Sequence, residues 1–281
     1  MNIIFFGNTP KSLIGAKILH EELGITAIVT IPDRIGKRGE SVQSPLKLFG
    51  IEKKIPVLTV NKLDAQATDE IAALKPDFLV VEDYGLILPQ KVLSLPKFAP
   101  LNVHHSLLPK YRGPAPAPFA ILAGDLVTGV SIIHMNEQVD AGAIYAQQKY
   151  TMTSNETTDS LLSKLNELGG ALVVKVIQEI VASKATPTPQ NESEATLTYY
   201  MNKTDGYLSM DNLPTKEQID RMIRAYFPWP NVWTKVSIKN KETRIKFLPE
   251  KKLQVEGKST VSIKDFINGY PDQKSLVEKV F

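Results

Sequence analysis

Short apolar runs alternate with stretches of helical apolar spacing along residues 1–150 of the chain. Apolar runs bounded by turn residues predict strands, and apolar side chains recurring every three or four residues predict helices. The predicted strands are Ile3–Phe6, Thr26–Thr30, Pro56–Leu58, Phe78–Val81, Leu101–His104, Val130–His134 and Ile144–Lys149. Helical patterns lie between several of them, for example at Lys11–Leu23 and Ala65–Leu74. This rhythm predicts an α/β fold of βαβ units with a Rossmann-like, mostly parallel sheet, in which ligands bind outside the carboxyl ends of the strands.

The pattern changes after residue 150. Residues 157–183 have the periodicity of one amphipathic helix, in which Gly169 and Gly170 would permit close packing. Residues 184–196 are polar and contain prolines, which is typical of a linker. The elements predicted after this linker are a helix at Lys216–Ala225 and strands at Thr234–Ile238, Thr243–Phe247, Lys252–Val255 and Thr260–Ile263. The sequence therefore predicts a larger domain over residues 1–183, a linker over 184–196 and a small OB-like β-barrel domain over 197–281.

Composition excludes several classes of site. The 281 residues include no cysteine, which excludes disulfides, thiol nucleophiles and cysteine-bound zinc and fits a reducing cytoplasm. The four histidines, at positions 20, 104, 105 and 134, lack metal-ligand spacing, so we expect no metal. No apolar run is long enough to span a bilayer, and the apolar start of the chain is too short for a signal peptide. We therefore expect a cytoplasmic protein without a membrane partner.

Charge is distributed unevenly. The net charge is +3, but residues 201–281 hold 15 Lys and Arg against 10 Asp and Glu, whereas residues 1–200 hold 18 against 20. A basic C-terminal part is typical either of an anionic partner or of ordinary solvated lysines, and charge alone does not separate the two.

The end of the predicted strand Leu101–His104 carries the strongest candidate chemistry. Asn102 and His104 alternate with apolar residues, so their side chains point to one face of the strand. A carboxamide N–H can hold a developing oxyanion and an imidazole can take a proton from an attacking amine, which together suit acyl transfer. The alternative is that Asn102 simply ends the strand and His104 is a half-buried structural ring. Prolines and Gly113 follow closely, so we expect a rigid loop at this strand end.

Two nucleotide-binding motifs are missing from the sequence. The first turn is Gly7-Asn8-Thr9-Pro10, which lacks the three-glycine dinucleotide fingerprint, and no segment matches a Walker A loop. The Rossmann-like rhythm therefore does not predict binding of a nicotinamide dinucleotide or of ATP.

Two segments carry a family resemblance. Asn102–Gly113 (NVHHSLLPKYRG) resembles a signature of the formyltransferases that use 10-formyltetrahydrofolate, and Thr128–Gly142 (TGVSIIHMNEQVDAG) looks like the second signature of that family. Other segments look like the branch of the family that acts on methionyl-tRNA, namely IIFFGNTP, VTIPDRIGKRGESVQSPLK, KPDFLVVEDYGLILP and IRAYFPWPNVWT. The resemblance implies transfer of a formyl group from 10-formyltetrahydrofolate to the α-amino group of initiator methionyl-tRNA. We expect the enzyme to be a monomer.

The resemblance also implies roles for individual residues. Asn102, His104 and Asp140 match the family's catalytic trio, with Asp140 orienting the imidazole, although an Asp before Ala-Gly is by itself usually a turn residue. The residues implied in folate binding are Tyr84, Gly85, Leu86, Ile87, Leu88, Pro89, Ser106, Leu107, Leu108, Pro109 and Val139. The residues implied in tRNA binding are Arg34, Lys37, Arg38, Tyr111, Arg112 and Gly113. The resemblance implies no metal.

The chain departs from the family pattern at several positions. Gln138 stands where the family usually has Gly, and Asn136 stands where it often has Asp. Glu82 and Asp83 occupy positions that are usually small or apolar, so they could reshape the folate pocket. His105 should face away from His104 because neighbouring strand residues alternate, and we interpret it as a loop or packing histidine. The C-terminal domain also looks shorter than usual for the family.

Other interpretations stay open. The acceptor could be an amino-sugar nucleotide with the same chemistry, or the chain could be a non-catalytic folate- or RNA-binding protein with a relic site. A dinucleotide oxidoreductase is disfavoured by the missing glycines. In the C-terminal part, Phe227 and Trp229 beside Arg221 and Arg224 either form a stacking surface for RNA or belong to the core of the small domain, which we favour.

Overall fold

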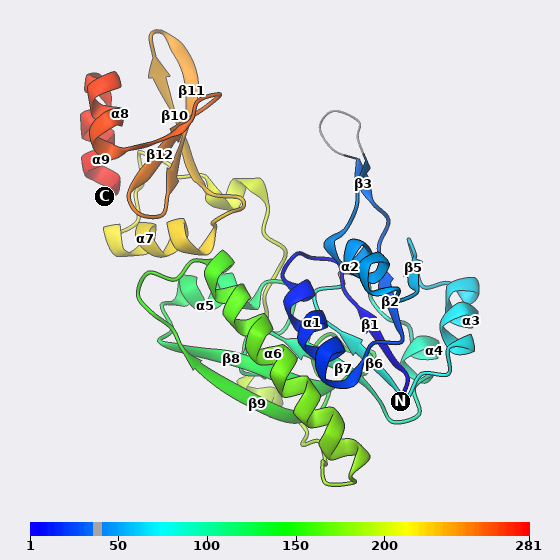
Figure 1. Ribbon diagram of the computed structural model, residues 1–281. Helices are drawn as coiled ribbons and strands as arrows, with labels where there is room; N and C mark the ends of the chain where they lie inside the picture. Colours follow the sequence, from blue (N-terminus) through cyan, green and yellow to red (C-terminus); the bar gives the residue numbers. More distant parts are fainter. Residues whose placement is uncertain (36–40) are drawn as a thin grey trace. The chain divides into compact units, whose positions relative to one another are not determined.

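The computed structural model describes residues 1–35 and 41–281, and its backbone is drawn in Figure 1. The chain forms two compact units that are each discontinuous in sequence. The first unit is Met1–Pro114, Val127–Thr151 and Leu162–Leu197, and the second is Ala115–Leu126, Met152–Leu161 and Thr198–Phe281. Residues 184–196, predicted as a linker, thus belong to the first unit, and two short segments from the middle of the chain belong to the second.

A seven-stranded sheet forms the centre of the first unit. Its strand order is β5 (Val57–Thr59), β2 (Ala27–Thr30), β1 (Ile3–Phe6), β6 (Phe78–Val81), β7 (Ala99–His104), β8 (Val127–His134) and β9 (Ile144–Thr151). The pairings from β5 to β7 are parallel, and those of β7 with β8 and β8 with β9 are antiparallel. The predicted Rossmann-like, mostly parallel sheet is therefore confirmed.

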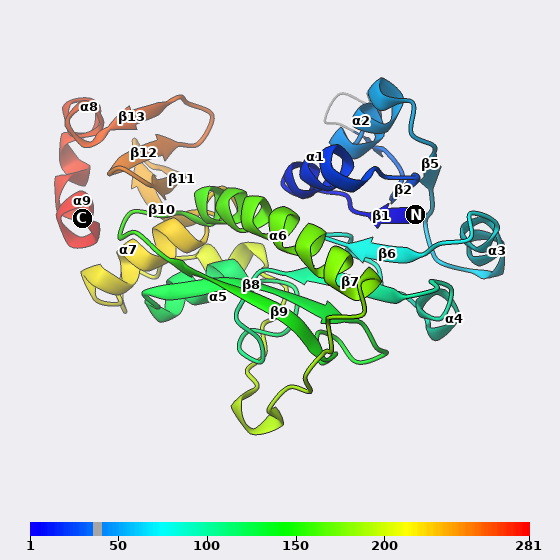
Figure 2. The same ribbon diagram turned by 60° about the horizontal axis from the view of Figure 1, so that its bottom comes forward.

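Helices cover both faces of this sheet, as Figure 2 shows. On one face lie α1 (Ser12–Leu23), α2 (Pro45–Lys53) and the long α6 (Thr158–Val181). A Cβ added at Gly170 of α6 would lie 3.0 Å from the Cα of Gly15 in α1, so the absence of side chains lets these two helices approach closely. On the other face, α3 (Ala65–Ala73) and α4 (Gln90–Leu93) bury apolar side chains against β1, β2 and β6.

Proline positions explain two helices that the sequence pattern did not predict. Both α2 and α5 (Pro116–Ala123) have proline in their first turn, where a missing backbone N–H costs no hydrogen bond and the fixed φ suits a helix. The rigid loop expected after His104 therefore ends at Ala115, and its last prolines begin α5. A short ribbon of β3 (Arg34–Ile35) and β4 (Ser41–Val42) was also not predicted.

The second unit contains a four-stranded antiparallel sheet and helices. The strands follow one another in the order β10 (Val232–Ile238), β11 (Lys241–Leu248), β12 (Lys252–Val255) and β13 (Thr260–Ser262). The helices of this unit are α5, α7 (Lys216–Ala225), α8 (Ile263–Gly269) and α9 (Lys274–Val280). Since β10 and β13 stand at the two ends of the order, the predicted closed barrel is not confirmed. Across residues 1–35 and 41–281, no helix has the length and apolarity needed to cross a membrane.

Candidate active site

The strand order reverses at the middle of the sheet. From β1 the chain passes to β2 on one side, and it later returns to place β6 on the other side of β1. Ligands in such sheets bind where the strand order reverses, outside the carboxyl ends of the strands. The segments that leave this edge are the turn after Phe6, the loop after Val81 and the loop after His104.

Strand β7 presents the two side chains singled out in the sequence. Val81 pairs with Asn102, and Val81 belongs to the apolar cluster on the α3 and α4 face. Asn102 and His104 therefore share that face. The residue between them, Val103, points to the opposite face, where a Cβ added at Gly169 of α6 would meet it at 2.5 Å.

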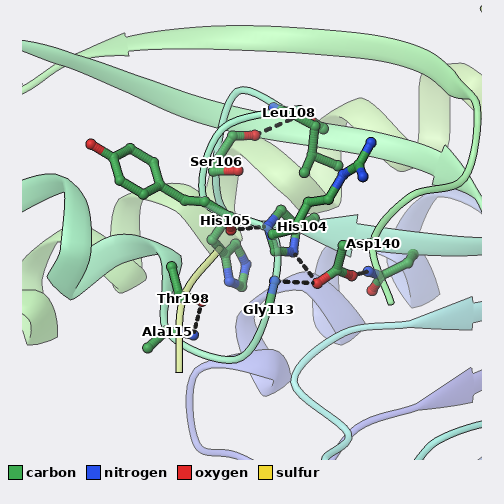
Figure 3. A network of polar contacts seen from close by, with 12 residues as sticks. His104, His105, Ser106, Leu108, Gly113, Ala115, Asp140 and Thr198 are labelled. Atoms are coloured by element: carbon green, nitrogen blue, oxygen red, sulfur yellow. Dashed lines mark hydrogen bonds and ion pairs between the residues drawn. The ribbon is translucent and has the colours of Figure 1, made fainter. Parts of the chain in front are cut away.

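Asp140 lies in the loop between β8 and β9 and contacts both Asn102 and His104. Figure 3 shows Asp140 beside the His104 ring and Gly113. The Asn102 Nδ2 donates to Asp140 Oδ1 at 3.1 Å, and the Gly113 backbone N–H donates to Oδ2 at 2.7 Å. The Nδ1 of His104 is 3.6 Å from Oδ2, an ion-pair distance that is too long for a hydrogen bond. The structure thus brings together the three residues that the sequence suggested, from two separate segments.

The second ring nitrogen of His104 defines its tautomer. Nε2 lies 2.9 Å from the carbonyl oxygen of Tyr111, and since a carbonyl only accepts, the Nε2 carries a hydrogen. In the neutral ring the lone pair is then on Nδ1, which faces Asp140. Burial lowers the pKa of His104 below its ordinary value, while the charge of Asp140 acts in the opposite direction. Burial therefore favours the neutral ring, while the carboxylate beside Nδ1 favours the charged form.

Two residues of the site have unusual backbone conformations. Asp140 has φ 51° and Tyr111 has φ 61°, in the left-handed region that most side chains avoid. Such conformations persist only where surrounding contacts hold them, and they concentrate at functional sites.

Hydrogen bonds to neighbouring strands fix the loop after β7. The Ser106 hydroxyl donates to the Lys110 carbonyl at 2.6 Å. The Ser131 hydroxyl of β8 donates to the Ser106 carbonyl at 2.6 Å and accepts from the Leu108 N–H at 3.1 Å. Gln147 of β9 donates to the Leu108 carbonyl at 2.9 Å. Sequence analysis missed Ser131 and Gln147, because on an alternating strand they look like ordinary outward-facing polar residues.

A second buried polar cluster lies next to the site. His105 Nε2 is 3.4 Å from Glu82 Oε1, and His105 Nδ1 is 3.5 Å from Asp83 Oδ1. Burial raises the pKa of Glu82 to about 7. Burial alone would lower the pKa of His105, but Asp83 and Glu82 raise it above its ordinary value. His105 does face away from His104, but it is part of a charged cluster and not only a packing residue.

The loop after β6 divides into buried and accessible residues. Tyr84 and Leu88 are part of the apolar cluster, where the Tyr84 ring meets Phe6 edge-on at 5.3 Å and burial raises the pKa of its hydroxyl. Leu86 packs partly against the same cluster, whereas Gly85, Ile87 and Pro89 are exposed. Val139, beside Asp140, is also exposed. Leu107 is half-buried, and the Pro109 carbonyl accepts from the Thr196 N–H at 3.2 Å.

The residues predicted to bind tRNA have different surroundings. Arg112 is buried, and its guanidinium donates to Glu192 and Gln190. Tyr111 and Gly113 contact His104 and Asp140 through their backbones. The backbone of Arg34 is in β3, and Lys37 and Arg38 lie outside the described residues.

In the second unit, Trp229 is exposed, which corrects the sequence-based preference for the core, and Phe227 is half-buried. Nearby, the guanidinium groups of Arg221 and Arg224 bind the carboxylates of Glu217 and Asp220 on the same helix.

Comparisons with known proteins place these observations in a family. Residues 1–177 match the formyl transferase family. A methionyl-tRNA formyltransferase from Marinobacter nauticus is 35% identical over 83% of this chain and 76% of its own length, and one from Lactobacillus gasseri is 32% identical over 100% and 99%. A solved structure, a methionyl-tRNA formyltransferase from Clostridium thermocellum, superposes with a TM-score of 0.60 over 94% of this chain and 99% of that chain, at 17% identity.

Proposed function

Because this chain belongs to the formyl transferase family and is related along its whole length to methionyl-tRNA formyltransferases, we propose that it formylates the α-amino group of methionyl-tRNA. The formyl donor in this proposal is 10-formyltetrahydrofolate. The observation that carries the proposal is the polar group of Asn102, His104 and Asp140 at the carboxyl edge of the sheet. We propose further that the enzyme acts in the cytoplasm as a monomer.

In this mechanism Asn102 stabilises negative charge. One N–H of its carboxamide is bound to Asp140, which leaves the second N–H to donate to the oxygen of the formyl group as an amine adds to the carbon. A fixed donor of this kind contributes about 3 kcal/mol to transition-state stability in well-studied acyl-transfer enzymes.

His104 handles the proton. Its lone pair on Nδ1 would accept the proton of the attacking amine, and the resulting imidazolium would be stabilised by Asp140 on one side and the Tyr111 carbonyl on the other. General-base catalysis of this type is worth roughly 10² to 10⁴ in rate. The proton would then pass to the departing amine of the folate, so that no proton is gained or lost overall.

The folate would bind where the strand order reverses, beside the loop after β6. Since Tyr84 and Leu88 are packed in the core, they would support the wall of the pocket from behind. The accessible Gly85 and Ile87, together with the exposed Val139, would provide the contact surface. This assignment is supported by the strand order, because ligands in such sheets bind where the order reverses, here between β1 and β6, and β6 is the neighbour of the strand that carries Asn102.

The acceptor assignment is supported by the relatives and by charge. The basic excess of residues 201–281 and the exposed Trp229 suit a phosphate-rich partner that offers bases for stacking. Arg34, with Lys37 and Arg38, remains our candidate for contacts to the acceptor end of the tRNA.

The test is transfer of a labelled formyl group from 10-formyltetrahydrofolate to charged initiator tRNA, with uncharged tRNA and a 4-amino-sugar nucleotide as alternative acceptors. We expect formylation of methionyl-tRNA only, falling steeply with salt, and a loss of roughly 10² to 10⁴ in kcat for His104→Ala. A sugar nucleotide that reacts while tRNA is inert would assign the other acceptor. Transfer that is absent, or unaffected by His104→Ala, would leave a binding protein with a relic site.

A further inference from the structure

Residues 188–197 bind along the loops of the site, and we refer to them as the strap. At one end of the strap, Thr188 exchanges two backbone hydrogen bonds of 2.8 Å with Ile144. At the other end, the Arg112 N–H donates to the Thr196 carbonyl at 2.8 Å, and the Tyr111 N–H donates to the Thr196 hydroxyl at 2.8 Å. The strap therefore contacts both the loop after β7 and the segment that leads from Asp140 into β9.

Gln190, in the middle of the strap, connects these two loops through one side chain. Its Nε2 donates to the backbone carbonyls of Asp140 at 2.8 Å and of Gly142 at 2.7 Å. Its Oε1 accepts from the Nε of Arg112 at 3.0 Å and from the Nη2 at 2.8 Å. Both hydrogens and the oxygen of the carboxamide are thus used, which fixes the orientation of the group.

Arg112 is held in turn by Glu192 of the strap. The guanidinium donates to both carboxylate oxygens of Glu192, at 2.8 and 2.7 Å. This two-pronged geometry is the most directional that an arginine and a carboxylate can form. The buried guanidinium is therefore held between Glu192 and Gln190 of the strap.

We propose that Gln190 and Arg112 are positioning residues, which hold the backbone of Asp140 so that its carboxylate stays against Asn102 and His104. Asp140 needs such support because its φ of 51° is unfavourable for a residue with a side chain. Gly142 supports the same turn, since a Cβ there would collide with the His134 carbonyl. The expected effect on kcat rests on the proposed function, whereas the expected effect on the protonation of His104 rests on geometry alone.

The first variant is Gln190→Glu, which keeps the size and the acceptor but replaces the N–H donors with an oxygen facing two carbonyls. We expect kcat to fall by roughly tenfold to a hundredfold, because small displacements of a catalytic group have effects of this size. The KM values should change by less than about twofold, since no substrate contact is removed. The control is Glu194→Gln in the same strap, whose side chain accepts from Asn191. Thermal unfolding of both variants corrects kcat for any unfolded fraction.

A structural role alone would not change the acid–base behaviour of His104. If Asp140 is displaced, the imidazolium loses stabilisation, and the acid limb of the kcat profile should move to lower pH in Gln190→Met, a neutral variant that adds no charge near His104. The same shift should be seen in the NMR titration of the His104 ring, which requires no substrate. A wild-type enzyme that fails to formylate tRNA would refute the proposed function, whereas this titration would still decide the inference.

The second variant, Arg112→Lys, keeps the charge but loses the two-pronged geometry. We expect kcat to fall in Arg112→Lys, but by less than in Gln190→Glu. Combining the two substitutions should cause no further loss of kcat, because the two residues act through one contact. The inference is wrong if the His104 titration is the same in wild type and the neutral variant Gln190→Met. It is also wrong if Arg112→Lys raises the KM for tRNA while kcat is unchanged, because Arg112 would then contact the tRNA itself.

Discussion

At the scale of single residues, Glu82 is an ionisable side chain in a buried position. It is 1% exposed, its Oε1 faces His105, and a Cβ added at Gly15 would collide with its Oε2. Within the described residues no hydrogen-bond partner reaches Oε2. A buried carboxylate with an unpaired oxygen is costly in its charged form, which is why its pKa is raised.

This cluster makes folding stability depend on pH. Glu82 titrates at about pH 7 when folded and at about 4.5 when unfolded, so folding loses free energy as the pH rises between these values. The raised pKa of His105 acts in the same direction, because its contribution is lost as the pH rises through its folded pKa.

We predict that Glu82→Gln flattens this dependence. The wild type should lose on the order of 3 kcal/mol between pH 4.5 and pH 7, and the variant should lose much less because no carboxylate ionises there. Urea unfolding at several pH values measures the difference. Glu70→Gln, an exposed carboxylate on α3 that accepts from Gln66, is the matched control. Parallel profiles for wild type and Glu82→Gln would contradict the prediction.

At the scale of single elements, α6 packs against the strand that carries Asn102 and His104, so a substitution in this contact should change both the stability of the fold and the geometry of the site. Gly169 faces Val103, whose strand neighbours are Asn102 and His104. A larger residue at 169 would therefore push on the strand that carries the catalytic side chains. Close packing of this kind is sensitive to single methyl groups.

We predict that Gly169→Ala destabilises the protein by about 1–3 kcal/mol, despite the better helix propensity of alanine, because the new Cβ would lie 2.5 Å from Val103 Cγ1. Adding Val103→Ala should recover part of the loss, since it removes the colliding methyl. The control is Gly269→Ala in α8, where nothing lies within 4 Å. Equal unfolding free energies for the two single variants would disprove this packing argument.

Prediction from sequence succeeded where local pattern decides structure. β1, β6 and β12 begin and end where predicted, as does α7, because apolar periodicity and a capping box define them locally. The shared face of Asn102 and His104 follows from strand alternation alone. In contrast, the approach of Asp140 depends on the path of a long loop, and Gln190 and Glu192 have the composition of a solvated linker. Pattern cannot distinguish a polar side chain in water from one that binds a distant backbone.

At the scale of the molecule, the second unit is assembled from three segments of the chain. Phe119 of α5 meets the Tyr199 ring edge-on at 4.8 Å, and the Thr158 hydroxyl donates to the Ala225 carbonyl at 2.6 Å. The two segments from the middle of the chain are thus contacted by residues that come after 197.

We predict that a fragment of residues 1–197 does not fold into a stable monomer, because α5 and residues 152–161 would lose these contacts and expose apolar surface. Size-exclusion chromatography should detect aggregates, and co-expression with residues 198–281 should restore a soluble complex. A monomeric fragment 1–197 with a cooperative thermal transition near that of the whole chain would show instead that the interleaved segments are dispensable.

Interleaving also constrains how such a protein can evolve. Recombination between genes exchanges continuous stretches of sequence, and an exchange beginning near residue 198 would bring in a foreign C-terminal piece without the two earlier segments it is built around. We therefore expect specificity for a new acceptor to evolve through gradual substitutions along the whole chain, and not through the exchange of whole domains between genes.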